Sequence, residues 1–380
     1  MVKITVMQEQ LQKGLGHVSR AVATKTSLPV LGNILLATDR GQLKLAATNL
    51  EIGITCWIDC AIDEEGAVTV PARLLTDFIG NLPNEAVKLE LDRRTLALNV
   101  RAARSKATVR GIDAEDFPAI PTVEGKPTAL IAPDMLREAI GQVAFAAAVD
   151  ESRPVLAGVQ LRFSGNQLTL SAADGFRMAV RVAELVGPAT EDVAIIVPAK
   201  ALNELSRALS DATDPVEIVV TRGRNQLLCR TGNIEFLSRL IDGSFPDWKQ
   251  IVPSSYSTRT VLNRDALLGA AKLASYFARD NNDVVKLSIK PGNGEYAPGS
   301  LTISANAAEV GDNTSDIDAA VEGPEGQIAF NVRYLNDVLG SLKTPQVALE
   351  MQNSASAGVI RPVGNSDSTH VIMPMHLASY

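Results

Sequence analysis

The feature that most constrains the fold is a strand-turn pattern that occurs three times at domain-sized spacing. In the segment Gln167–Arg181 apolar and polar residues alternate up to an Asp-Gly dipeptide, which is typical of a half-buried strand followed by a turn. Leu43, Leu168 and Leu301 hold equivalent places in the three copies, at steps of 125 (168 − 43) and 133 (301 − 168) residues. Domains are most often about 100–150 residues long, so the pattern predicts three copies of one domain.

Other landmarks keep nearly the same offset. Leu11 and Leu136, which each start an apolar stripe at helical spacing, are 125 residues apart (136 − 11), and Phe117 and Phe245 are 128 apart (245 − 117). Chance recurrence of strand-turn patterns is the alternative, and agreement among independent landmarks argues against it. We therefore expect three domains, at residues 1–125, 126–253 and 254–380.

Each copy is expected to run helix, strands, helix, strands. Apolar residues at i, i+4, i+7 and i+11 predict the first helix, and Pro71 favours the start of a second. Pro29–Leu36 and Gln42–Cys60 are expected to form strands between them. In the third copy the Gly- and Pro-rich insertion Pro291–Ser300 lengthens a hairpin. Two helices packed on antiparallel sheets predict an α+β domain, repeated three times.

Composition limits the classes of function. With 46% apolar and 21% charged residues, the chain has the composition of a soluble globular protein. Its net charge of −7 argues against tight nucleic-acid binding by bulk charge, and 16 aromatic residues (9 Phe, 5 Tyr, 2 Trp) argue against a stacking platform for single strands. We expect neither a signal peptide nor a membrane span, because no suitable apolar run is present.

The three cysteines cannot all pair, and none has metal-ligand spacing. Alternate apolar positions from Leu50 to Cys60 form one face of an expected strand, so Cys56 and Cys60 are interpreted as buried small hydrophobic residues. We expect a reducing cytoplasm, no metal and no cofactor.

No catalytic constellation is visible. Motifs for phosphate loops, dinucleotide binding, zinc proteases and nucleophile elbows do not occur, and the three histidines form no dyad. Asp174 could hold a catalytic carboxylate, but its counterparts are Asn49 and Ala307, so we expect its role not to be shared by the copies. The sequence gives no catalytic residues.

Basic residues recur on the expected helices of this acidic chain, although ordinary mixed-charge helix surfaces explain them equally well. They are Lys13, Arg20, Arg73, Arg137, Lys200, Arg207, Arg264, Lys272, Arg279, Arg333 and Lys343.

Six motifs resemble those of one family, the bacterial DNA polymerase III beta subunit, or replicative sliding clamp. They are LPVLGNILL at 28–36, TVPAR at 69–73, DGFRMAV at 174–180, SRLIDGSFPDW at 238–248, FNVRYLNDVL at 330–339 and VIMPMHL at 371–377. The resemblance implies a non-catalytic processivity factor, a head-to-tail homodimer that forms a closed ring of six domains around double-stranded DNA. It also implies partners such as the polymerase III catalytic subunit, the clamp loader and other proteins that carry clamp-binding peptides.

The resemblance also implies three sets of site residues. The DNA-facing set is Lys25, Arg73, Arg153 and Lys200. The partner-peptide cleft is Leu156, Gly175, Phe176, Arg177, Met178, Pro246, Ile251, Asn331, Tyr334, Met373, Pro374, Met375 and Leu377. The dimer seam is Arg104, Lys106, Ala107, Val109, Tyr276 and Phe277. Core packing is the alternative for Met373 and Met375.

Two features depart from the family pattern. Phe176 is aromatic where some relatives have a polar residue, and Ala378–Tyr380 extend beyond the usual end of the chain. Two other functional classes stay open: a three-domain binding scaffold or adhesin with no DNA role, and an enzyme that uses Asp174 or glutamate residues in an inter-domain cleft.

Overall fold

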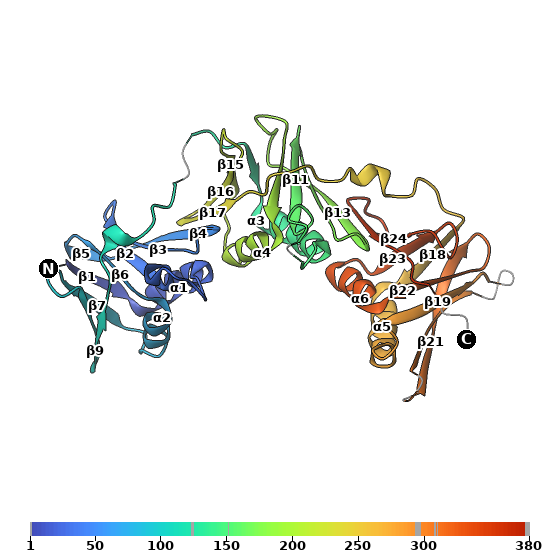
Figure 1. The fold of residues 1–380 in the computed structure, drawn as a ribbon, viewed down its shortest axis with the longest axis horizontal. Helices are drawn as coiled ribbons and strands as arrows, with labels where there is room; N and C mark the ends of the chain where they lie inside the picture. Colours follow the sequence, from blue (N-terminus) through green and yellow to red (C-terminus); the bar gives the residue numbers. More distant parts are fainter. Residues whose placement is uncertain are drawn as a thin grey trace. The chain divides into compact units, whose positions relative to one another are not determined.

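The computed structural model describes residues 2–122, 125–150, 152–292, 298–307, 309 and 311–376 (Figure 1). The chain divides into two compact units. The N-terminal unit comprises residues 1–134, 185–191 and 200–240, and the C-terminal unit comprises residues 135–184, 192–199 and 241–380. The second sequence copy therefore contributes strands to both units.

The N-terminal unit contains two antiparallel sheets. The first has the strand order β5 (Ala61–Glu64), β1 (Val2–Met7), β7 (Ala86–Asp92), β8 (Ala97–Ala102) and β9 (Ser105–Arg110). The second has the order β10 (Ala129–Ile131), β15 (Val216–Val220), β16 (Gln226–Thr231), β17 (Ile234–Arg239), β4 (Ile52–Ile58), β3 (Gln42–Thr48), β2 (Asn33–Asp39) and β6 (Ala67–Pro71). Pairing of β4 with β17 joins strands of the first and second copies.

The C-terminal unit contains one twelve-stranded sheet. Its order is β14 (Val193–Pro198), β11 (Gly158–Ser164), β12 (Gln167–Ala173), β13 (Arg177–Glu184), β25 (Ser368–Ile372), β24 (Gly358–Pro362), β23 (Gln346–Met351), β18 (Thr258–Asn263), β21 (Gly311–Glu322), β20 (Gly299–Ala307), β19 (Val284–Lys290) and β22 (Gly326–Asn331). Pairing of β13 with β25 joins strands of the second and third copies.

Six α-helices are described, two from each sequence copy. They are α1 (Gln8–Val18), α2 (Ala72–Gly80), α3 (Pro133–Val143), α4 (Ala199–Ala208), α5 (Arg264–Ala278) and α6 (Val332–Ser341). Apolar positions at helical spacing bury one face of each helix: Leu11 and Leu15 of α1, for example, have no exposed surface. The α+β class expected from the sequence is confirmed.

Strand β4 differs from the expected half-buried strand, because all seven of its residues are buried. On one face α1 approaches so closely that a Cβ on Gly14 would lie 3.3 Å from Ile58 Cγ2 of β4 and 2.8 Å from Leu45 Cδ1 of the neighbouring β3. On the other face Ile120 covers Gly53, with Ile120 Cγ2 3.0 Å from where a Gly53 Cβ would be. Leu50, which was expected on the strand face, instead lies in the turn before β4 and is 46% exposed.

One further expectation is corrected at a proline-containing segment. The Pro29–Leu36 segment begins with a 3₁₀ turn, Pro29–Gly32, because proline at the first position has a φ suited to a helical turn; β2 starts only at Asn33. The C-terminal strand ends at Ile372, before Pro374. Within Pro291–Ser300, residues 293–297 lie outside the described residues, but β19 and β20 pair on either side as expected.

Cysteine burial agrees with the sequence interpretation for Cys56, but Cys60 lies beyond the end of β4 and is not fully buried. Cys56 and Cys229 are buried, and burial raises the pKa of each thiol to about 12. Cys60 is half-buried, and burial raises its thiol pKa as well. Across the described ranges, no cluster of three or more His, Cys, Asp or Glu side chains has metal-site geometry, and no helix is long and apolar enough to cross a membrane.

Candidate functional site

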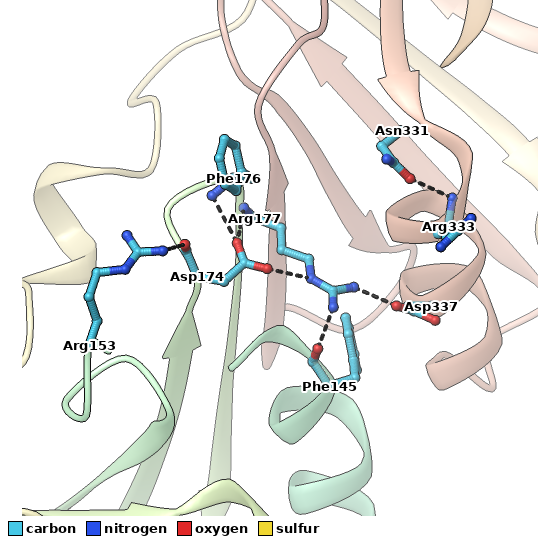
Figure 2. Close-up of polar contacts among 8 residues, drawn as sticks. All are labelled: Phe145, Arg153, Asp174, Phe176, Arg177, Asn331, Arg333 and Asp337. Atoms are coloured by element: carbon cyan, nitrogen blue, oxygen red, sulfur yellow. Dashed lines mark hydrogen bonds and ion pairs between the residues drawn. The ribbon is translucent and has the colours of Figure 1, made fainter. Parts of the chain in front are cut away.

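The site in the C-terminal unit is built around the turn between β12 and β13. Asp174 Oδ1 accepts hydrogen bonds from the backbone N–H groups of Phe176 (2.8 Å) and Arg177 (3.0 Å). Gly175 has a φ of 95°, in the left-handed region that glycine adopts without a steric penalty. Figure 2 shows the hydrogen bonds to Asp174 that fix this turn. Phe176, within the turn, is 60% exposed.

Arg177 links this turn to two other elements (Figure 2). Its Nε donates to Asp174 Oδ2 (3.1 Å), its Nη1 to Asp337 Oδ2 on α6 (2.5 Å) and its Nη2 to the Phe145 carbonyl oxygen (2.7 Å). The guanidinium also lies 4.4 Å from the Tyr334 ring centroid and 5.4 Å from that of Phe145. A planar guanidinium suits this combination of forked donors and aromatic faces, so Arg177 is held in one position.

Neutral aromatic groups surround this charged centre. Burial raises the pKa of the Tyr334 hydroxyl, and the nearby Asp174 carboxylate raises it further, so the hydroxyl stays protonated at neutral pH. His370 on β25 is fully buried and stacks on Phe145, with ring centroids 5.9 Å apart. Burial lowers the pKa of His370 to about 3, so its imidazole is neutral.

The segment after β25 runs beside the turn and leaves apolar side chains at the surface. Met373 N donates to the Phe176 carbonyl (2.8 Å), and Met375 N donates to the Ala329 carbonyl (2.9 Å). Met373 is 43% exposed and Met375 is half-buried, so plain core packing is wrong for Met373. Ile251, 40% exposed, is a further surface apolar residue of this unit.

The other residues expected in the cleft differ in burial and in local role. Met178 is buried in a cluster with Phe245 and the half-buried Trp248, so its side chain lies beneath the surface. Asn331 Oδ1 accepts from Arg333 N (2.9 Å) and thereby caps α6 (Figure 2). Of the other residues expected in the cleft, Leu156 and Pro374 are half-buried and Pro246 is exposed. Leu377 lies outside the residues that the structure describes.

Sequence reasoning missed the partners that hold Arg177. Asp174 had a local signal, since Asp-Gly turns commonly use the carboxylate to cap the following amides. Asp337 and Phe145 had none, because they are far from Arg177 in the sequence and come together only in the fold. Arg153, which was expected to face DNA, donates from Nη2 to the Asp174 carbonyl (3.2 Å) and thus lies beside this turn (Figure 2).

The N-terminal unit repeats the turn. Asn49 Oδ1 accepts from Glu51 N (3.0 Å) and Ile52 N (2.8 Å), as Asp174 does with its own second and third following residues. Asn49 and Asp174 therefore share the capping of the turn, a role separate from the catalytic one for which no sharing was expected. Only the charge of Asp174 is particular to the second copy.

The other residues expected to face DNA are exposed and come from the N-terminal unit. Lys25 lies in the segment after the first helix. Arg73 and Lys200 occupy the first turns of α2 and α4, and the Arg73 side chain is 96% exposed. The Arg73–Asp77 pair, at 3.7 Å, is too exposed to hold Arg73 strongly.

Many other cations on helices are paired with acids. In order of sequence, the pairs are Lys13–Asp211 (3.1 Å), Arg20–Glu204 (3.7 Å), Arg207–Glu204 (2.6 Å), Arg264–Asp265 (3.0 Å) and Arg333–Asp283 (2.8 Å). Lys343, just after α6, pairs with Glu138 (3.4 Å). The mixed-charge alternative therefore describes much of the helix surface, and an excess of positive charge is confined to particular positions.

Two sheet edges bear on the expected seam. Strand β9 is an edge strand, with Lys106 and Arg110 exposed. Strand β21 pairs with β18 only through residues 319–322, so within the described chain one side of 311–317 is unpaired. Of the expected seam residues, Arg104 and Lys106 are exposed, Ala107 and Phe277 are half-buried, Tyr276 is 64% exposed, and Val109 is buried in its own unit.

Comparison with known proteins covers nearly the whole chain. Residues 2–121, 130–247 and 249–376 match the models of the N-terminal, central and C-terminal domains of the DNA polymerase III beta subunit. The beta sliding clamp of Pseudomonas putida KT2440 is 34% identical, over 98% of this chain and 99% of its own, and that of Synechocystis is 31% identical over 100% of both.

Solved structures agree with these sequence matches. The DNA polymerase sliding clamp of Bacillus subtilis is 29% identical with a TM-score of 0.92, over 99% of both chains. A DNA polymerase III subunit beta sliding clamp of Pseudomonas aeruginosa, bound to griselimycin, is 32% identical with a TM-score of 0.90, over 99% of this chain and 100% of that one. The chain belongs to the DNA polymerase III beta subunit family.

Proposed function

We propose that this protein is the sliding clamp of bacterial DNA replication, a ring that encircles duplex DNA and tethers the replicative polymerase. The observation that carries this proposal is the ordered match of three beta-subunit domain models along one chain. The family consists of non-catalytic processivity factors, so no chemical step is assigned to the chain. We divide the chain into domains 1–125, 126–253 and 254–380, a division that the three matched ranges support.

The ring would be a head-to-tail homodimer of six domains, and the two free sheet edges support this. The β9 edge presents Lys106 and Arg110, whereas β21 carries Asp312, Asp316 and Asp318. Basic and acidic edges of two copies would attract each other and could continue one sheet by main-chain hydrogen bonds. Because such a contact joins different surfaces, two copies must close by rotation to form a ring.

Contact with DNA would be loose. Lys25, Arg73 and Lys200 are exposed cations, while the chain as a whole carries a net charge of −7. A few phosphate contacts, made directly or through water, position a duplex without reading its sequence. Retention would come from the closed ring, which lets the protein move along DNA. We retain Arg153 in this set, although it also contacts the cleft turn.

Partner proteins would bind the cleft of the C-terminal unit through short extended peptides. Phe176, Met373 and Ile251 supply exposed apolar surface, and a flexible methionine side chain adapts to ligands of different shape. Arg177 and its partners hold the cleft wall in position before a peptide arrives. Candidates for these partners are the polymerase III catalytic subunit, the clamp loader and other replication or repair proteins.

We place the protein in the cytoplasm, where bacterial DNA is replicated. Three free cysteines, two of them buried with strongly raised pKa values, suit a reducing compartment. The alternative of a scaffold with no DNA role gains no support from the family.

The test is primer extension on a long primed single-stranded circle, with the polymerase and clamp loader of the same organism. The wild-type protein should convert short products into full-length ones. Met375→Ala should lose this effect while it remains a dimer by light scattering, because the substitution alters the cleft and not the sheet edges. Products of equal length with and without the wild-type protein would refute the proposal.

A further inference from the structure

The turn before β4 in the N-terminal unit reproduces the cleft turn before β13 in atomic detail. Asn49 N donates to the Ile52 carbonyl at 3.2 Å, and Asp174 N donates to the Arg177 carbonyl at the same distance. The second residue of each turn is in the left-handed region, with φ 73° at Leu50 and φ 95° at Gly175. The two turns therefore have one backbone conformation.

The neighbouring strand is also arranged in the same way. Arg239 N donates to the Glu51 carbonyl at 2.8 Å, as Met373 N donates to the Phe176 carbonyl at 2.8 Å. Phe176 and Met373 are exposed apolar residues. At the matching positions of the N-terminal unit stand two exposed charged residues, Glu51 and Arg239. The backbone is repeated, but its surface chemistry is different.

A connecting segment crosses each sheet at the corresponding place. In the C-terminal unit Phe245 and Trp248 belong to one apolar cluster with Met178. In the N-terminal unit Phe117 and Ile120 belong to one apolar cluster, and Ile120 covers Gly53, the counterpart of Met178. Each connection therefore forms one wall beside its turn.

Beside the N-terminal turn lies a pocket of about 300 Å³. Three apolar side chains line this pocket: Leu237 is buried, Ile120 is half-buried and Leu50 is exposed. Leu50 adopts a left-handed conformation that leucine rarely takes, and such backbone outliers cluster at binding sites. The volume is at the lower end of the range for small ligand sites, enough for one or two side chains of a peptide.

Charge restricts what this pocket would bind. Arg239 is the one charged residue that lines it, and within the described part of the chain its guanidinium has no ion pair. An exposed arginine fork suits a carboxylate, which it can bind with two parallel hydrogen bonds. Asn225 and Gln226, also in the lining, add amide groups that can bond to a peptide backbone.

We propose that this pocket is a second peptide-binding site, specific for an extended segment of a partner protein that carries an acidic residue beside an aliphatic one. The aliphatic side chain packs on Leu50, Ile120 and Leu237, and the carboxylate pairs with Arg239. The site differs from the C-terminal cleft, whose corresponding rim is apolar. A protein with two unlike peptide segments could therefore occupy both sites of one chain.

The test uses the full-length protein with ¹³C-labelled leucine and methionine methyl groups. The probe is the peptide acetyl-Ala-Leu-Asp-Leu-Ala-amide, and its matched control has Asn in place of Asp. Saturable shifts of the Leu50 and Leu237 methyl signals are expected with the Asp peptide, and binding about ten-fold weaker with the Asn peptide. Met373 and Met375 report the C-terminal cleft separately, so failure of either site is seen independently of the other.

Variants make the assignment specific. Arg239→Gln should weaken peptide binding about ten-fold. The control is Arg224→Gln, which changes an exposed arginine in the turn between β15 and β16. Arg224 does not line the pocket, so peptide binding should be unchanged. Leu50→Gly should also weaken binding, and it should fold because glycine suits the φ of that position. Shifts confined to Met373 and Met375, equal binding of the Asp and Asn peptides, or no saturable shift of Leu50 and Leu237 at about 5 mM peptide would overturn the proposal.

Discussion

The β4–β17 junction of the N-terminal unit and the β13–β25 junction of the C-terminal unit have one backbone and two sets of side chains. Both have an Asx-capped turn, a left-handed second residue and an equivalent hydrogen bond to the neighbouring strand. Ile52, Glu51 and Phe236 of the first junction correspond to Arg177, Phe176 and His370 of the second. The repeat thus preserves the backbone that the fold requires, while the exposed and polar side chains differ between the two junctions.

The largest difference is Arg177, which has no charged counterpart at Ile52. Arg177→Ala would leave Asp174 without its salt bridge and the Phe145 carbonyl without its donor. We expect the free energy of unfolding to fall by about 3 kcal/mol, because breaking a largely buried ion pair leaves an uncompensated charge.

Urea denaturation measures this effect, and Asp337→Asn is the milder control, since Asp337 is 45% exposed. A loss for Arg177→Ala no larger than for Asp337→Asn would show that Arg177 does not organise the turn.

Exchanging the exposed rim residue tests the chemistry of the junction alone. Phe176→Glu gives the second junction the residue of the first at a 60% exposed position. Peptide affinity at the C-terminal cleft should fall by about 2 kcal/mol, or roughly 30-fold, because an aromatic anchor is replaced by a hydrated charge. Stability should be unchanged.

Isothermal titration with a clamp-binding peptide, together with thermal unfolding, measures both quantities. Met375→Ala provides a second cleft variant, for which we expect about ten-fold weaker binding. Unchanged affinity in Phe176→Glu would mean that this rim does not contact the peptide.

The buried imidazole of His370 should make the second junction sensitive to acid. Its folded pKa of about 3 lies below the ordinary value of 6.5, so the unfolded chain binds a proton first as the pH falls. The stability contributed by neutral His370 is complete above pH 6.5 and is lost progressively as the pH falls towards 3. Between pH 6.5 and 5.5 we expect a loss of about 1 kcal/mol.

His370→Phe, which introduces the residue found at Phe236, is the matched variant. The difference in unfolding free energy between the two proteins, measured by urea denaturation at several pH values, isolates the histidine. Parallel pH profiles would rule out His370 as the source of acid sensitivity.

The smallest effects are expected at equivalent cations of α2 and α4. Arg73 and Lys200 each lie two residues after the proline that precedes its helix. Arg73→Ala and Lys200→Ala should each weaken DNA binding by less than about three-fold, because each would remove one of the few exposed cations proposed to contact phosphate. Fluorescence anisotropy with a short duplex at two salt concentrations measures this, and complete loss in either single variant would contradict loose contact.

Much of the fold could be predicted because its signals are local. Apolar periodicity located the helices, and the repeat indicated three α+β copies. Burial of β4 on both faces could not be predicted, since it depends on α1 and on Ile120, which are remote in sequence. Leu50 was assigned to a strand face because leucine gives no signal for a left-handed turn.

For the candidate site, some residues could be predicted from the sequence and others could not. Motifs indicated Phe176, Arg177 and Met373, whereas Asp337 and Phe145 are brought to Arg177 only by tertiary packing. For the basic helices the sequence left a functional set and an ordinary mixed-charge surface equally open, because ion pairing depends on the position of acids on neighbouring elements.

The most direct test of the central claim is retention on DNA of defined topology. The protein is loaded onto a nicked circular plasmid, separated from free protein by gel filtration, and then the plasmid is cut at one site. A ring that surrounds DNA without gripping it should stay on the circle and leave rapidly once an end is available. Equal retention on circular and linearised plasmid would contradict the account.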